Sequence, residues 1–207
     1  MKNMLILTGP QGSGNHLFSK VFALHSEVYG WKTLLDIYWE GHHHEPFNYC
    51  WNDCSNLSNF DWDQSDYYVT SISCPYIKDK RKVVPNYREF IKQVSKYCNV
   101  SIAIIGRDQT ILKKQQTRVR DEMTTDYWKE HSSWLMDTYP VHFLSQELLY
   151  LYKDKYLRSV SRELNWPIAF WDERLTKILE TDSNEKYIKY VDSHWLDNSV
   201  IKAIKES

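Results

Sequence analysis

A glycine-rich turn near the start of the chain constrains the fold more than any other feature. The run Gly9-Pro10-Gln11-Gly12-Ser13-Gly14-Asn15-His16 follows a short apolar segment, residues 4–8. Such a segment, ended by a turn, is typical of a strand buried on both faces, and these strands belong to parallel sheets. After the turn, apolar residues recur at the spacing of one helix face, which Gly30 can end; they are Leu17, Phe18, Val21, Phe22, His25 and Val28. The sequence therefore predicts a strand, a glycine-rich turn and a helix.

Strand and helix signals alternate along the rest of the chain. We predict further strands at residues 31–38, 67–73, 100–105 and 141–144. Helices are predicted after Asn86, which forms a capping box with Glu89, after Asp108, and along the amphipathic stretch from Leu149 to Leu164. No internal repeat or long linker divides the chain. The pattern predicts a three-layer α/β/α fold with a mostly parallel central sheet of about five strands, like that of P-loop-containing nucleoside triphosphate hydrolases, in one domain spanning residues 1–207.

Charge and hydropathy exclude several classes of protein. The 26 Lys and Arg residues nearly balance 27 Asp and Glu, so an anionic ligand needs a local cluster of donors. The sequence contains no apolar run long enough for a transmembrane helix, and its first apolar stretch is too short for a signal peptide. Without an export signal, the four cysteines are expected to be reduced thiols. We therefore expect a cytoplasmic protein with neither nucleic acid nor membrane as a partner.

The glycine turn has the spacing of a phosphate-binding loop, G-x-x-x-x-G, between a strand and a helix. Such a loop presents backbone N–H groups to an anion at the positive end of a helix. The Lys and Ser/Thr that follow this motif in nucleoside triphosphatases are replaced by Asn15 and His16. In nucleoside triphosphatases that Lys and that Ser/Thr neutralise the phosphates and hold Mg²⁺. Their replacement therefore favours a less charged, metal-free donor. The alternative is a tight turn that binds nothing.

A second candidate anion ligand, Arg107, follows the strand at residues 100–105. Ligand sites in α/β folds lie at the carboxyl ends of the strands, and Arg offers a planar fork to phosphate oxygens. The alternative is a surface ion pair beside Asp108. In the following helix Lys113, Lys114, Arg118 and Arg120 indicate a mostly solvated face, from which Arg118 or Arg120 would be the ones to reach the pocket.

Together these segments resemble the sulfotransferases. Residues 10–15 look like the family's loop for the 5′-phosphosulfate, and Arg107 with Gln115 eight residues later looks like the pair that binds the 3′-phosphate. Residues 141–164 resemble a later strand and helix, and the likeness covers most of residues 1–165. It implies metal-independent transfer of a sulfuryl group from 3′-phosphoadenosine 5′-phosphosulfate (PAPS) to a hydroxyl or amine. The implied donor-binding residues are Gln11, Gly12, Ser13, Gly14, Asn15, His16, Arg107 and Gln115.

The sequence departs from that family at three places. The loop lacks a lysine, unless Gln11 or His16 takes its role; Gln115 stands where Ser is usual; and an R-K-G segment near the C-terminus is missing. These departures imply weaker binding of the donor or a different nucleotide donor. Two other functions stay open: a P-loop nucleotide or nucleoside kinase with Arg107, Arg118 and Arg120 as lid residues, and a nucleotide-binding module without catalysis.

Residues 38–45 supply the candidates for a general base, because they follow the predicted second strand toward the same sheet edge. Glu40, His42 and His43 are the candidates there, with His44 beside them, and His16 is a separate candidate. A solvated polar loop is the alternative. Aromatic residues nearby are expected to wall the site of a small-molecule or glycan acceptor; they are Tyr38, Trp39, Phe47, Tyr49 and Trp51.

No metal site is predicted. The three consecutive histidines point in different directions on an extended loop, and Cys50-x-x-x-Cys54 lacks a second close cysteine pair. The segment from Ile168 to Glu173 is interpreted as a helix start, in preference to a strand ending in a metal-binding Asp172.

Overall fold

A central sheet of five parallel strands organises the computed structural model, which describes residues 2–37, 39–78, 81–120 and 123–181, without the side chains of residues 119 and 120. The strands lie in the order β2-β3-β1-β6-β7, and each neighbouring pair is parallel. Their bounds are β1 (Lys2–Gly9), β2 (Val28–Tyr29), β3 (Tyr67–Ser73), β6 (Cys98–Gly106) and β7 (Val141–Ser145). The predicted α/β fold with about five strands is confirmed.

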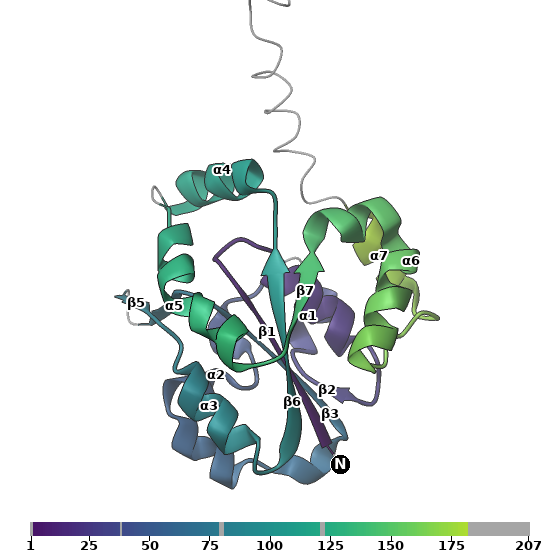
Figure 1. The fold of residues 1–207 in the computed structure, drawn as a ribbon. Coiled ribbons are helices and arrows are strands. Elements are labelled where there is room, and N and C mark those ends of the chain that lie inside the picture. The colour runs from purple at the N-terminus through teal and green to yellow at the C-terminus, as the bar shows by residue number, and fades with distance from the viewer. Residues whose placement is uncertain (1, 38, 79–80, 121–122, 182–207) are drawn as a thin grey trace, which may run out of the picture.

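Helices cover both faces of this sheet (Figure 1). One face carries α1 (Asn15–Ala23), α6 (Gln146–Leu164) and α7 (Glu173–Glu180); the other carries α2 (Asn48–Asn52), α3 (Tyr87–Val94) and α5 (Thr125–Thr138). Helix α4 (Gln109–Arg120) follows the carboxyl end of β6, and β4 (Tyr76–Lys78) pairs with β5 (Arg81–Val83) in a separate hairpin. Among the described residues no helix is both long and apolar enough to cross a membrane.

Strand β1 shows why the fold has three layers. Its residues alternate between the two faces of the sheet. Leu5 and Leu7 join the core under α1, whereas Met4 and Ile6 join the core under α3. All four side chains are fully buried, as the continuous apolar run predicts.

Short polar side chains cap the helices predicted after Asn86 and Asp108. The Asn86 side chain accepts a hydrogen bond from the N–H of Glu89 at 3.3 Å, and Asp108 Oδ1 accepts from the N–H of Thr110 and of Ile111, each at 2.9 Å. Asp172 caps α7, so this residue begins a helix and does not end a metal-binding strand. All four cysteines are buried and free, which confirms the expected thiols.

The predicted boundaries between residues 15 and 38 were wrong. Helix α1 stops at Ala23, and Val28 pairs with Tyr67 in β2 instead of continuing the helix face. Of the strand predicted at residues 31–38, the described residues 31–37 do not form a strand, since a 3-10 turn, η1 (Thr33–Asp36), occupies the segment. Lys32 Nζ donates to two carbonyl groups at the end of α1, those of Ala23 and His25, and so folds this segment back onto the helix.

Residues 40–62 form short helices where the sequence suggests a loop. They are η2 (His42–His44), α2, η3 (Cys54–Asn59) and η4 (Trp62–Gln64). Phe47 and Trp51 are buried, and Trp51 stacks on Phe90 with ring centroids 3.6 Å apart. Two aromatics predicted to wall an acceptor site are therefore core residues. Trp39 and Tyr49 are exposed, and Tyr38 lies outside the described residues.

Helix α6 differs from the predicted single amphipathic face. Lys153 has φ 45° and ψ −120°, which interrupts the helical backbone. The apolar face is interrupted next to the kink, where Tyr152 is exposed, but Leu149 before the kink and Val160 after it are buried in the same core. Helix α5 and the β4–β5 hairpin were not predicted.

Candidate functional site

The loop between β1 and α1 depends on glycine at two positions. Gly12 has φ 88° and Gly14 has φ 118°, a region that side chains other than glycine rarely adopt. Gly14 is also the N-cap of α1, and it has no side chain to accept from the first N–H groups of the helix. The positive end of α1 therefore faces the loop, which is the arrangement that favours an anion.

Ser13 and Asn15 fasten the loop to the sheet. Both side chains are buried. Ser13 Oγ donates to Asn15 Oδ1 at 3.3 Å, and Asn15 Nδ2 donates to the hydroxyl of Ser73, at the end of β3, at 2.8 Å. This chain of hydrogen bonds fixes the shape of the loop before any ligand binds.

Arg107 reaches the loop from the end of β6. Its Nη1 atom donates to the Gly12 carbonyl oxygen at 2.8 Å and to Gln115 Oε1 at 2.6 Å. Only 7% of the residue is exposed. The structure thus brings the loop together with Arg107 and Gln115, from which it is separated by about a hundred residues in the sequence.

The Gln11 side chain lies in a buried polar cluster. Its Oε1 atom accepts from the Thr124 hydroxyl at 3.5 Å, and the Gln11 carbonyl oxygen accepts from Gln116 Nε2 at 2.6 Å. Gln116 Oε1 in turn accepts from the N–H of Thr124 at 2.9 Å. The Gln11 side chain therefore holds the loop against the segment between α4 and α5.

His16, in the first turn of α1, lies in an aromatic cluster. Its Nε2 atom is 2.8 Å from the carbonyl oxygen of Glu40. Because a carbonyl oxygen only accepts, Nε2 carries the proton and Nδ1 carries the lone pair. Its ring centroid is 5.1 Å from that of Trp31, 4.7 Å from that of His42 and 6.1 Å from that of Trp39. Burial lowers the pKa of His16, so the ring is neutral near pH 7.

The Glu40 carboxylate accepts hydrogen bonds from neighbouring side chains. Its Oε2 atom accepts from Thr33 Oγ1 and from Trp31 Nε1, each at 2.6 Å, and Oε1 lies 3.8 Å from His44 Nδ1. The hydrogen bond from Thr33 is the largest cause of a lowered Glu40 pKa. A carboxylate stabilised in this way is a weak base, and its position suits it to orient Trp31.

The three consecutive histidines divide between the site and solvent. His42 is half-buried against His16 and Trp31. His43 and His44 are exposed, with their ring centroids 4.0 Å apart. Of the base candidates, His16, Glu40 and His42 thus lie together, while His43 and His44 are exposed, with His44 beside the Glu40 carboxylate.

The arrangement of elements is similar to that of a solved structure, although no family model and no curated protein matches the sequence. That structure is the sulfotransferase domain from the Synechococcus PCC 7002 olefin synthase, with a TM-score of 0.51. The alignment covers 88% of this chain and 80% of that chain at 15% sequence identity. The chain has a sulfotransferase fold. The resemblance seen in the sequence is therefore confirmed at the level of the fold.

Two buried residues of this sulfotransferase fold were not predicted from the sequence. The first is Gln116, whose fully buried amide joins the loop to Thr124. The second is Glu45, which is 4% exposed and accepts from the N–H of Phe47 at 2.9 Å. Burial raises the Glu45 pKa to about 8, although nearby Thr70, Phe47 and Ser71 act to lower it. Neither residue has a sequence motif that would reveal it, because each depends on partners brought close by the fold.

The helical face of α4 agrees with the prediction of a mostly solvated surface. Lys113 and Arg118 are exposed and Lys114 is half-buried, while the side chain of Arg120 lies outside the described part of the chain. In the described ranges, no three His, Cys, Asp or Glu side chains gather in a way that could hold a metal ion.

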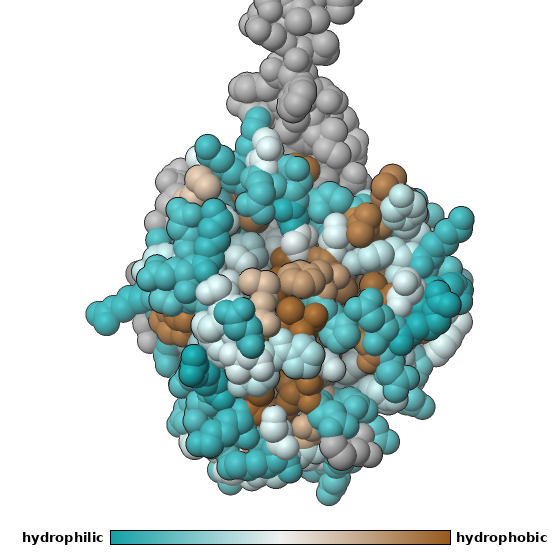
Figure 2. Space-filling view, viewed as in Figure 1, coloured by the Kyte–Doolittle hydropathy of each residue, from teal (hydrophilic) through white to brown (hydrophobic). Residues whose placement is uncertain are grey.

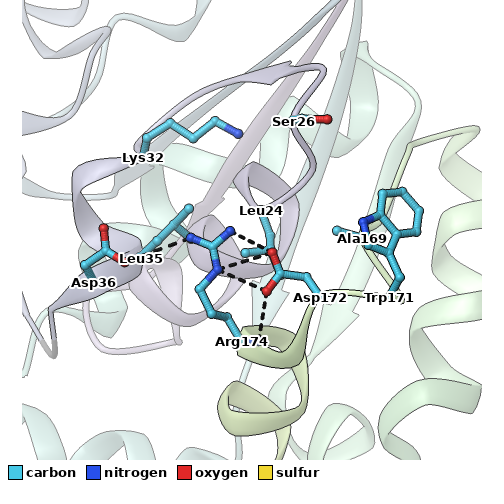
Figure 3. A pocket seen from close by; sticks show the side chains of 9 residues that line it. All are labelled: Leu24, Ser26, Lys32, Leu35, Asp36, Ala169, Trp171, Asp172 and Arg174. Carbon is cyan, nitrogen blue, oxygen red and sulfur yellow. Dashed lines mark hydrogen bonds and ion pairs between the residues drawn. The ribbon is translucent and has the colours of Figure 1, made fainter.

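A separate surface pocket of about 330 Å³ lies between the end of α1, η1 and the start of α7 (Figure 3). Three of its four charged side chains pair with one another: Arg174 Nη2 lies 2.6 Å from Asp172 Oδ2, and Arg174 Nη1 lies 3.9 Å from Asp36 Oδ1. None of the predicted site residues lines it. This pocket of the sulfotransferase fold is therefore distinct from the glycine loop.

Proposed function

We propose that this chain is a sulfotransferase that moves the sulfuryl group of PAPS to an acceptor hydroxyl or amine. The observation that carries the proposal is the contact of buried Arg107 with both the Gly12 carbonyl oxygen and Gln115. It places a guanidinium beside a glycine loop at the carboxyl ends of the strands, in a chain with a sulfotransferase fold.

The residues present fit an anionic donor with two phosphate positions. At the 5′ position, the glycines leave the loop backbone unshielded, and α1 directs its positive end toward it. At the 3′ position, Arg107 and Gln115 supply a cation and an amide. No lysine stands in the loop, and the Gln11 side chain packs against Thr124, so charge neutralisation falls to Arg107 and the backbone N–H groups. PAPS would supply the activated sulfuryl group.

His16 is the residue best placed to remove the proton from the acceptor. Its ring is neutral, and hydrogen bonding of Nε2 to the Glu40 carbonyl oxygen leaves Nδ1 as the proton acceptor. The ring sits in the first turn after the loop, so the base and the phosphosulfate-binding backbone belong to one rigid segment. Glu40 is a positioning residue in this proposal, because its carboxylate holds Trp31 against the His16 ring.

Trp39 provides a wall for the acceptor. Its side chain is 65% exposed and nearly parallel to the His16 ring, at an interplanar angle of 25°. An open indole beside the base suits the flat face of a small molecule or a glycan ring.

The test is acceptor-dependent release of 3′-phosphoadenosine 5′-phosphate (PAP) from PAPS, measured without Mg²⁺ across amino sugars, oligosaccharides and phenols. We expect His16→Gln to lower the transfer rate by about 100-fold or more, and His43→Gln, a change at an exposed histidine, to leave it unchanged. If the protein binds PAP but releases none from PAPS with any acceptor, the transferase proposal is wrong and a binding module remains. Mg²⁺-dependent phosphate transfer from ATP would instead identify a kinase.

A further inference from the structure

Helix α4 turns one polar side chain inward, toward the glycine loop. Figure 2 shows mostly hydrophilic side chains over this helix, near the top of the view, and Lys113 and Arg118 are exposed. Gln116, on the same helix, is fully buried. Burying an amide is costly unless both its donor and its acceptor find partners. Gln116 therefore needs partners inside the protein, and the glycine loop supplies one of them.

The hydrogen bonds of Gln116 fix which way its amide faces. The Oε1 atom accepts from the N–H of Thr124 at 2.9 Å and from the Thr125 hydroxyl at 3.2 Å. Because a backbone N–H only donates, the atom that faces it is the amide oxygen. The amide nitrogen therefore faces the carbonyl oxygen of Gln11, at 2.6 Å, and donates to it. Gln116 thus ties a carbonyl group of the loop to the start of α5.

The Gln11 carbonyl group belongs to the central peptide of a tight turn. The Ser13 N–H donates to the Pro10 carbonyl oxygen at 3.1 Å, which closes a β-turn over residues 10–13. Gly12, the third residue of this turn, has φ 88°, which fits a type II turn and not a type I turn. The dihedral angles of the two types differ by roughly half a rotation of the central peptide. The peptide that joins Gln11 to Gly12 thus has two alternative orientations, and Gln116 binds its oxygen in one of them.

We propose that Gln116 is a positioning residue for the sulfuryl donor, an inference that rests on the proposed function. In a trans peptide the C=O and N–H groups point to opposite sides. With its oxygen held by Gln116, the central peptide directs the Gly12 N–H away from the Thr124 cluster, where it donates to the 5′-phosphosulfate. Pro10 has no N–H, and the turn uses the N–H of Ser13. The orientation of this one peptide therefore decides how many donors the turn offers to an anion.

Calorimetry with three nucleotides tests this role. Gln116→Met keeps the length of the side chain but cannot donate to the Gln11 carbonyl oxygen. We expect it to lose about 10- to 100-fold in affinity for PAP and for 5′-AMP, the scale of a hydrogen bond to a charged group. It should bind adenosine 3′-monophosphate, which lacks the 5′ group, as tightly as wild type, whereas a change that only loosened the fold would weaken the binding of all three nucleotides.

Gln64→Met is the matched control and should leave all three affinities unchanged. Gln64 also donates from Nε2 to a backbone carbonyl oxygen, that of Asp61 at 3.0 Å, but it is exposed on η4. Wild-type affinity of Gln116→Met for 5′-AMP, or an equal loss for all three nucleotides, would overturn the positioning role and leave the proposed function standing. If wild type bound none of the nucleotides, the proposed function and this inference would both be wrong.

The wild-type chain supplies a second test, which decides the matter if Gln116→Met does not fold. The chain contains six glycines, so selective nitrogen-15 labelling of glycine gives a simple spectrum in which the Gly12 amide can be followed. We expect 5′-AMP to move the Gly12 amide proton downfield, as hydrogen bonding to a phosphate does, and adenosine 3′-monophosphate to leave it in place. A Gly12 signal that ignores 5′-AMP, or that responds equally to both nucleotides, would overturn the positioning role.

Discussion

The guanidinium of Arg107 lies 2.8 Å from the carbonyl oxygen of Gly12, measured from Nη1. This contact joins the end of β6 to the turn after β1, two segments that approach each other because β1 and β6 are neighbours in the sheet. The same atom reaches Gln115 on α4. One buried side chain thus links the three parts of the candidate donor site, and a change in any of them is expected to alter the other two.

Replacing Gly12 tests the geometry of this contact. In Gly12→Ala a Cβ atom would overlap the Gln115 Oε1 atom, and the residue would keep a φ of 88° that costs about 1–2 kcal/mol for an L-residue. We expect a lower melting temperature and a loss of PAP binding in calorimetry.

The control for that change is Gly106→Ala. Its Cβ would meet only the Leu144 carbonyl oxygen at 3.7 Å, an ordinary contact. The added variant Gly12→Ala/Gln115→Ala removes the overlap but not the backbone strain, so it should recover part of the stability. Unchanged PAP affinity in Gly12→Ala would contradict the proposed loop contact.

The pH profile of transfer tests the role of His16. Burial lowers the pKa of this ring, and the neutral form is the base. Because the folded-state pKa lies below the ordinary value of about 6.5, the rate should be constant near neutral pH and fall only at more acidic pH. In kcat/KM measurements the acid limb should have its midpoint below that value and should disappear in His16→Gln. An acid limb that persists in this variant would assign the proton transfer to another group.

The stability of the fold should depend on pH through Glu45. Burial raises the pKa of this carboxyl from 4.5 to about 8, so the folded chain holds a proton there that the unfolded chain releases. Its contribution is therefore fully present below pH 4.5 and is lost as pH rises through 8. We expect the unfolding free energy from urea titrations to fall across this range.

Glu45→Gln keeps the shape of the side chain but cannot ionise. The fall in unfolding free energy between these pH values should be smaller in this variant than in the wild type. An identical pH dependence in the two proteins would mean that Glu45 is ionised in the folded chain.

Trp39 should affect the acceptor and not the donor. Trp39→Ala removes the exposed indole beside His16, and we expect the acceptor KM to rise about tenfold, the scale of one aromatic contact. Trp171→Ala is the matched control, because Trp171 is 72% exposed but lines the separate pocket near α7. Equal effects of the two changes on acceptor KM, or a loss of PAP affinity in Trp39→Ala, would place the acceptor elsewhere.

The sequence predicted the parts of the fold that depend on local signals. The loop carries its own glycines, the buried strands are continuous apolar runs, and Asn86, Asp108 and Asp172 cap helices through nearby N–H groups. Arg107 and Gln115 were paired because of their resemblance to the residues that bind the 3′-phosphate in sulfotransferases, and the structure places them in contact. That they bind a phosphate stays a prediction.

The errors arose where distant contacts decide the structure. Val28 matches the helix spacing of α1 but pairs with Tyr67, thirty-nine positions along the chain, in β2. Phe47 and Trp51 look like the wall of a cleft but are buried under the sheet, where the Trp51 indole donates to Thr70 at 2.9 Å. The sequence around Glu45 is typical of a polar loop, and its burial depends on contacts that form only in the folded chain.

We propose that Arg107 binds a 3′-phosphate while the glycine loop binds the 5′ group. Isothermal titration of wild type and Arg107→Ala with PAP and with 5′-AMP, which lacks the 3′-phosphate, separates these roles. Arg158→Ala, at an exposed arginine on α6, is the control. We expect wild type to bind PAP more tightly than 5′-AMP, and Arg107→Ala to lose about 10- to 100-fold in PAP affinity, the scale of a hydrogen bond to a charged group, with little change for 5′-AMP. Equal affinity of wild type for the two nucleotides, or an equal loss for both in Arg107→Ala, would mean that Arg107 does not bind the 3′-phosphate.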